Sequence, residues 1–533
     1  MLRPLLFAVV ACLALVRATT AEDGNAPIQR KLTTHELANW IDERFEKEYQ
    51  RAAVAAAPAI DDATFLRRLY LDLQGHIPTV AQTRDFLADD GSFKRQDSVD
   101  RLLIEDGPQN RFATHTAEHL ARVWRRMMVP ASSPGAGMAV RIDPWLKKQF
   151  SDNVPYNEIA KKLLLAAPPP MRQPAGAQPA TDSGPDSLAG IFQQAVGASP
   201  ENLTGAFVRV FLGMRINCAQ CHDHPFTDWK QKDFWGVAAF FQGPPADGSD
   251  MAQAAPTITP QGERQLTYTA KLLWTEQPLT EIAAAKSPRQ MLAEWMVSPS
   301  NPNFAATAVN RVWQYLCGRG LAGSVDELDR VTTEERFVLD ELAKLFVASG
   351  HDVRWLIAGI CKSRVYQQLA AAEPGSENGL VRRPLKTLLP EQIFDSLEVA
   401  LSLPISKADQ GPRFSGERDQ FVARMNEAAP ESPSDYKGGI PQALMLMNGK
   451  LTADATSLSA SRTLRAVVEA PFLPPEEKIE TLYFAVLSRR PKQAETQFLL
   501  ERLRQQADDP AQQSAYAEIM WGLLNSPEFV LSR

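Results

Sequence analysis

Cys218, Cys221 and His222 form the pattern CxxCH. Two thiols at this spacing can add to the two vinyl groups of one haem, while the adjacent imidazole coordinates the iron from the same side. The whole chain has only 5 cysteines and 7 histidines, so chance alone rarely produces the pattern. We interpret Cys218 and Cys221 as attachment points for haem c and His222 as the proximal iron ligand.

Two other interpretations of the same residues stay open. Cys218 and Cys221 could hold Zn²⁺ together with His222 or His224 and a distant fourth ligand, although closed zinc sites usually separate their ligand pairs by a longer spacer. Alternatively, the two thiols form a disulfide in an oxidising compartment, and both histidines are polar loop residues. Either alternative indicates a secreted binding or scaffold protein.

A second ligand on the metal would have to come from elsewhere in the chain. His224 lies too close to His222 in sequence to reach the opposite face of a haem easily. His115 and His119 are four residues apart on a predicted helix and project from one face, a spacing that also suits a metal pair. The competing interpretation is that both of these histidines face solvent.

The N-terminus is typical of an export signal. Arg3 supplies a positive charge, residues 5–16 form an apolar run too short to span a bilayer comfortably, and residues 18–21 are small enough for cleavage before Glu22. No later segment approaches 18 uninterrupted apolar residues. We therefore expect a signal peptide at 1–21 and a periplasmic or secreted mature protein without a membrane span.

The composition narrows the class of protein. The 533 residues are 44% hydrophobic and 23% charged, which fits a folded protein and excludes wholesale disorder. The formal net charge of −6 argues against a dedicated nucleic-acid binder. If the chain carries haem, its expected partner is an extracytoplasmic redox protein or enzyme.

Helices are expected to position the CxxCH site. An apolar helix face precedes it, formed by Phe207, Val208, Phe211 and Leu212. Further helix starts are predicted by capping residues at Ser287, Asn301, Thr332 and Asp352, and helix ends by Gly318 and Gly350. Strand signals are scarce, the best being residues 265–274. The predicted class is mainly α.

Proline and glycine mark the expected boundaries. The stretches 166–184, 243–262 and 404–439 are rich in these residues and are predicted to be loops. We expect two helical domains with minor β additions and long Pro/Gly-rich loops. The first would span 22–243 and contain the CxxCH site, a linker with short strands would span 244–284, and the second domain would span 285–533.

Several longer motifs resemble a known family. The run from Phe65 to Leu73 (FLRRLYLDL), the CxxCH segment and the run from Ala238 to Phe241 (AAFF) resemble the planctomycete secreted cytochrome-like domain of unknown function 1549. The second half resembles its companion, domain of unknown function 1553, in Asn310–Trp313 (NRVW) and Gly318–Leu321 (GRGL). The resemblance implies an exported cytochrome-like protein without an assigned activity, and association suggests a role in extracellular polysaccharide processing.

Overall fold

The computed structural model describes residues 31–532 except 104–110, 168–185, 243–254, 261–265, 280–285, 371–382, 403–414, 427–439, 450–451, 454–455 and 507. The expected signal peptide at 1–21 lies outside the described residues. Within them, none of the helices is long and apolar enough to cross a membrane.

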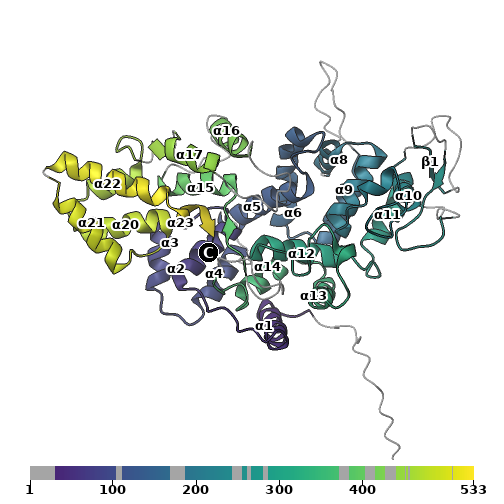
Figure 1. Ribbon diagram of the computed structural model, residues 1–533, viewed down its shortest axis with the longest axis horizontal. Coiled ribbons are helices and arrows are strands. Elements are labelled where there is room, and N and C mark those ends of the chain that lie inside the picture. Colours follow the sequence, from purple (N-terminus) through teal and green to yellow (C-terminus); the bar gives the residue numbers. More distant parts are fainter. Residues whose placement is uncertain are drawn as a thin grey trace, which may run out of the picture.

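Helices dominate the described chain, which confirms the mainly α class (Figure 1). The α-helices of the first half are α1 (Thr34–Arg51), α2 (Asp62–Leu73), α3 (Val80–Ala88), α4 (Lys94–Leu103), α5 (Arg111–Met128), α6 (Asp143–Ser151), α7 (Tyr156–Leu165), α8 (Ile191–Val196), α9 (Pro200–Leu212) and α10 (Gln231–Ala238). Those of the second half are α11 (Pro288–Met296), α12 (Phe304–Cys317), α13 (Phe337–Ala348), α14 (Val353–Lys362), α15 (Pro390–Ala400), α16 (Ser415–Asn426), α17 (Ile440–Asn448), α19 (Arg462–Val468), α20 (Pro475–Leu487), α21 (Gln493–Arg504), α22 (Asp509–Leu524) and α23 (Pro527–Val530). Short 3₁₀ helices are η1 (Ala136–Ile142), η2 (Ser187–Gly190), η3 (Asn217–Gln220), η4 (Ala239–Phe241) and η5 (Leu328–Arg330).

The β-strands among the described residues form two small antiparallel sheets, and an isolated β-bridge joins Ala59 to Gln368. Strand β1 (Thr257–Ile258) pairs with β2 (Tyr268–Thr269), which lies inside the segment with the strongest strand signal. Strand β3 (Lys386–Thr387) pairs with β4 (Leu531–Ser532), so the C-terminal end of the chain returns to the middle of the molecule (Figure 1). The expectation of minor β additions is therefore correct.

Local capping chemistry explains several helix boundaries. The Ser287 side chain accepts a hydrogen bond from the backbone of Gln290 at the start of α11, and Asp352 accepts one from Trp355 at the start of α14. Helix α12 ends at Gly318, whose φ of 85° is readily adopted only by glycine. The Thr332–Glu335 capping interaction also forms, but the regular helix α13 begins only at Phe337.

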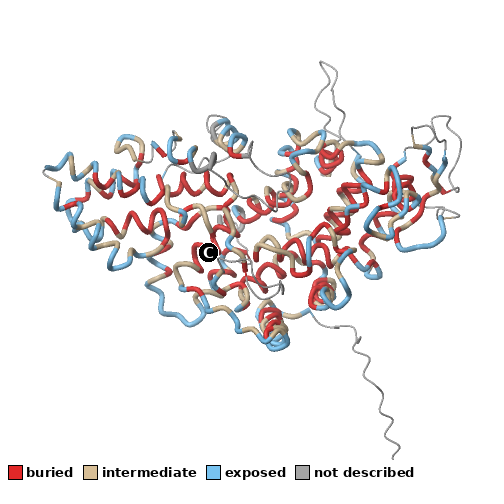
Figure 2. Tube along the Cα trace, viewed as in Figure 1, coloured by how far each residue is buried: buried red, intermediate tan, exposed pale blue. Residues whose placement is uncertain are grey.

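The described residues form two hydrophobic cores (Figure 2). One core runs from Leu37 to Tyr366, so helices α11 to α14 share it with helices that precede the expected linker. The other joins Leu71 and Ile77 to residues from Leu388 to Phe529. Most of the proline-rich stretch 243–262 lies outside the described residues, and the first core contains residues from both sides of it. The stretch 404–439 was expected to be a loop, but it contains helix α16.

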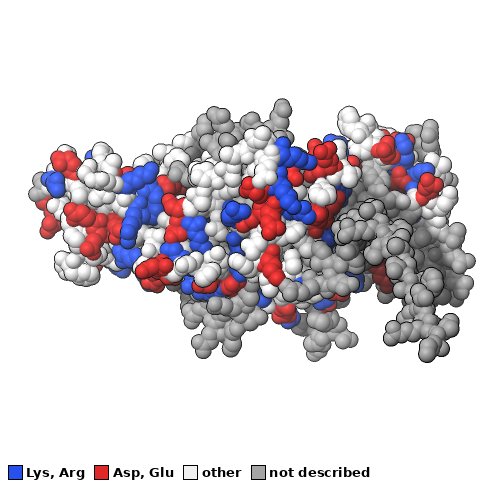
Figure 3. All heavy atoms as spheres, turned by 90° about the horizontal axis from the view of Figure 1, so that it is seen from below, with Lys and Arg blue, Asp and Glu red and all other residues white. Residues whose placement is uncertain are grey.

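Acidic and basic side chains are interspersed on the face of the molecule shown in Figure 3. Several ion pairs of the chain are exposed, such as that of Lys148 with Asp152 at 2.7 Å. Exposed pairs of this kind each contribute about 0–1 kcal/mol to stability. We therefore expect buried charges to contribute more to stability than these exposed pairs.

Two helical glycines are expected to respond oppositely to substitution by alanine. A Cβ on Gly359 in α14 would lie 2.2 Å from Leu37 of α1, whose side chain is fully buried, whereas a Cβ on Gly522 in α22 would meet nothing within 4 Å. Gly359→Ala should lower the free energy of unfolding by about 1–3 kcal/mol through overpacking. Gly522→Ala should raise it by up to about 1 kcal/mol through helix propensity. Urea denaturation of both variants checks this, and changes of the same sign would contradict the packing argument.

Candidate functional site

The CxxCH loop begins where helix α9 ends. Ser199 caps the start of α9, and its C-terminus stops at Gly213, which adopts a left-handed φ of 66°. The buried side of α9 includes Phe207 and Phe211, as the apolar periodicity predicts. After a short turn the chain enters η3, which contains Cys218. A packed helix therefore fixes the position of the loop.

The chemically reactive residues of this loop face solvent. Cys218, Cys221 and His222 are all exposed, and both thiols are free. Between them, Ala219 is fully buried and holds the turn against the core. The loop thus presents its two sulfur atoms and one imidazole outward from a fixed base.

Helix α10 holds the backbone of the loop in place. The Trp235 indole donates a hydrogen bond to the Gln220 carbonyl at 2.9 Å, and the Gln231 amide donates to the carbonyls of Gln220 and Cys221 at 3.1 and 3.3 Å. The Gln231 backbone N–H also donates to the Asp223 carboxylate at 3.0 Å, which lowers the pKa of Asp223. These bonds order the peptide that carries the two thiols.

The two histidines of the loop differ in their hydrogen bonds. His222 Nδ1 lies 2.7 Å from the Asp223 carbonyl, to which it can only donate, so Nε2 keeps its lone pair. His224 is buried, and its Nδ1 accepts a hydrogen bond from the Phe226 backbone at 3.2 Å. Its Nε2 must therefore carry the proton when the ring is neutral. Of the two rings, only that of His222 combines exposure with a free Nε2 lone pair.

Large aromatic side chains adjoin the loop. Phe226 is 81% exposed, although a phenylalanine side chain normally lies inside a protein. Trp229, whose carbonyl accepts a hydrogen bond from the His224 backbone, packs its ring 6.0 Å from that of Trp274, which is 44% exposed. Sequence patterns do not reveal this apolar surface, because Trp274 lies 45 residues from Trp229.

His115 and His119 lie in different environments. His115 is exposed, whereas His119 is buried on α5 and its Nε2 lies 2.7 Å from the Tyr315 hydroxyl. Burial lowers the pKa of His119 to about 3. His119 thus uses one ring nitrogen for Tyr315. Across the described part of the chain, no three His, Cys, Asp or Glu side chains are placed together to hold a metal ion.

Comparison with known families agrees with the motifs. Residues 40–245 match a family model described as PSCyt2, protein of unknown function (DUF1549), and residues 288–437 match one described as PSD1, protein of unknown function (DUF1553). The two matches follow one another in the expected order. The CxxCH loop lies within the PSCyt2 match. No curated protein and no solved structure matches the chain.

Proposed function

We propose that this chain is an exported c-type haem protein that transfers electrons to an extracytoplasmic redox protein or enzyme. Cys218 and Cys221 would attach the haem, and His222 would be the proximal ligand. The observation that carries the proposal is the joint exposure of two free thiols and an imidazole with an available Nε2. When bound, haem would supply one-electron redox chemistry with a potential set by its ligands and exposure.

The hydrogen bond of His222 supports this role. A histidine that ligates a metal usually donates its other ring N–H to a carbonyl or carboxylate, which fixes the tautomer and the ring orientation. The Asp223 carbonyl occupies that position at His222. Because α10 holds the neighbouring backbone, this orientation is imposed by the protein before any ligand is present.

The same geometry disfavours a zinc site. A zinc site needs its donors to converge on one point at about 2.0–2.3 Å, and the described residues contain no such group of three. Haem attachment makes a different demand, because each thiol bonds to its own vinyl group and only the imidazole reaches the iron. The exposed rings of Phe226 and Trp274 offer apolar surface for a macrocycle near the loop.

The test is production of the full chain in a bacterial periplasm with the haem-attachment machinery. The expected result is a Soret band and haem that stays with the polypeptide after denaturation. Cys218→Ser and Cys221→Ser should each weaken or abolish covalent retention, because each removes one thioether. Cys317→Ser is the matched control, since the Cys317 thiol is free but buried on α12.

Three results would contradict the proposal. One is folded protein without covalent haem, another is stoichiometric zinc, and the third is a disulfide between Cys218 and Cys221 in the purified protein. Equal loss of haem from Cys221→Ser and Cys317→Ser would indicate general misfolding and would also remove the support for specific attachment.

A further inference from the structure

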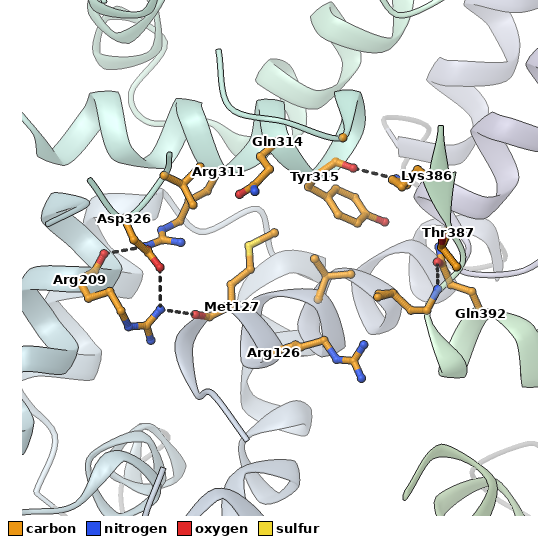
Figure 4. A pocket seen from close by; sticks show the side chains of 14 residues that line it. Arg126, Met127, Arg209, Arg311, Gln314, Tyr315, Asp326, Lys386, Thr387 and Gln392 are labelled. Carbon is orange, nitrogen blue, oxygen red and sulfur yellow. Dashed lines mark hydrogen bonds and ion pairs between the residues drawn. The ribbon is translucent and has the colours of Figure 1, made fainter. Parts of the chain in front are cut away.

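A cavity of about 120 Å³ is lined by residues of both family segments and by none of the CxxCH residues (Figure 4). Its wall includes Arg126 of α5 and Arg209 of α9 from the PSCyt2 segment. Arg311 of α12 and Lys386 of β3 contribute from the PSD1 segment. Four cationic residues therefore line one small space.

On one side of the cavity, two guanidinium groups share one carboxylate. Arg311 lies 2.6 Å and Arg209 3.8 Å from the oxygens of Asp326. Arg209 directs its other donors to the backbone carbonyls of Met127 and Met128. The three charged side chains are at most 15% exposed, and burial lowers the pKa of Arg209 to about 10. A single carboxylate thus balances two buried cations and also pairs with the more exposed Arg215 at 3.1 Å.

The other side repeats this imbalance. Lys386 donates to Asp72 at 2.5 Å, and the Arg383 guanidinium lies 3.6 Å from the same carboxylate. The Arg383 side chain is only 3% exposed, and none of its three nitrogens has a hydrogen-bond partner. Arg126 has its own carboxylate, Glu391, at 3.2 Å.

The charges around the cavity therefore do not cancel. Five cations, four that line the cavity and Arg383 beside Asp72, accompany three carboxylates, those of Asp72, Asp326 and Glu391. Uncompensated buried charge is costly, and an anion placed among the cations would remove that cost. We propose that this cavity binds the oxyanion group of a small molecule, and this inference does not depend on haem attachment.

The size of the cavity limits the ligand. An engineered cavity of about 150 Å³ holds one benzene molecule, so a space of about 120 Å³ holds about five heavy atoms. A sulfate, a phosphate or a short carboxylate has that size, alone or as the end of a longer molecule. Gln314 points into the cavity in Figure 4 and offers an amide donor beside the arginines, whose planar forks suit oxyanions.

The direct test uses the full chain with sodium sulfate, sodium phosphate and sodium acetate at constant ionic strength. Calorimetry should show millimolar or tighter binding of at least one anion. The preferred anion would distinguish tetrahedral from carboxylate ligands. Arg126→Met should weaken that binding at least tenfold. Its matched control is Arg125→Met on the same helix, because Arg125 pairs with Asp143 at 2.7 Å and does not line the cavity.

A second variant separates binding from folding. Gln314→Glu keeps the side-chain shape but places a carboxylate among the cations. It should raise the melting temperature without added anion and weaken anion binding at least tenfold, a pair of opposite effects that a purely structural role does not produce. Absence of binding by all three anions, or equal binding by Arg125→Met and Arg126→Met, would overturn the proposal.

Discussion

Asp72→Asn is expected to lower the free energy of unfolding by about 3–5 kcal/mol. The Asp72 side chain is fully buried and accepts hydrogen bonds from Lys386 at 2.5 Å and from the Tyr366 hydroxyl at 2.8 Å. Arg383 lies beside the same carboxylate. Asparagine keeps the shape but removes the negative charge, so two buried cations lose their shared counterion.

Asp62→Asn is the matched control for this experiment. Asp62 lies on the same helix, α2, and also pairs with two cations, Lys94 and Arg95, both at 2.7 Å. Its side chain is 33% exposed, so we expect a loss of no more than about 1 kcal/mol. Urea denaturation measures both changes. Similar losses in the two variants would show that burial of the charge does not determine the effect.

The role of Asp72 could not be predicted from the sequence. The run from Phe65 to Leu73 carries part of the family resemblance, but its sequence does not indicate what its charged side chains contact. The structure buries all nine residues of this run. A charged residue in a helix that is buried on every side needs a buried partner. The partners themselves lie more than 240 residues away in the chain, at Tyr315, Tyr366, Arg383 and Lys386.

Helix boundaries could be predicted better from the sequence, because the interactions that set them are local. The cap at Ser287 and the stop at Gly318 each depend on residues within one turn of the boundary. The division of the core is different. It depends on which helix faces meet between segments far apart in the chain, so local composition could not reveal that α12 packs with α9.

The candidate site shows the same contrast. The sequence identified Cys218, Cys221 and His222 and placed them after an apolar helix, which the structure has as α9. It could not show the hydrogen bond that orients His222, since carbonyl direction depends on the loop conformation. His119 was considered as a metal ligand or a solvent-facing residue. Its burial against Tyr315 depends on the packing of α5 beside a helix almost 200 residues later.

Acidification is expected to destabilise the protein through His119. The Tyr315 hydroxyl donates to the Asp72 carbonyl, so the His119 ring N–H donates to the Tyr315 oxygen and the neutral ring fits the site. Burial holds the pKa of His119 at about 3 in the native state, against 6.5 for an unperturbed histidine. Between pH 6.5 and 3 the unfolded state binds a proton that the native state excludes. The free energy of unfolding therefore falls by about 1.4 kcal/mol per pH unit, a loss of roughly 3 kcal/mol at pH 4.

Urea denaturation at pH 7 and pH 4 measures this loss, and His119→Gln should reduce it by most of that amount. Glutamine does not titrate, and its amide can still donate to Tyr315. His351, whose pKa burial lowers to about 4, contributes in the same direction and remains in both proteins, so the difference between the two isolates His119. His35→Gln, at an exposed position on α1, should leave the acid sensitivity unchanged. If His119→Gln loses as much stability as the original chain, the His119 ring is not the group whose protonation opposes folding.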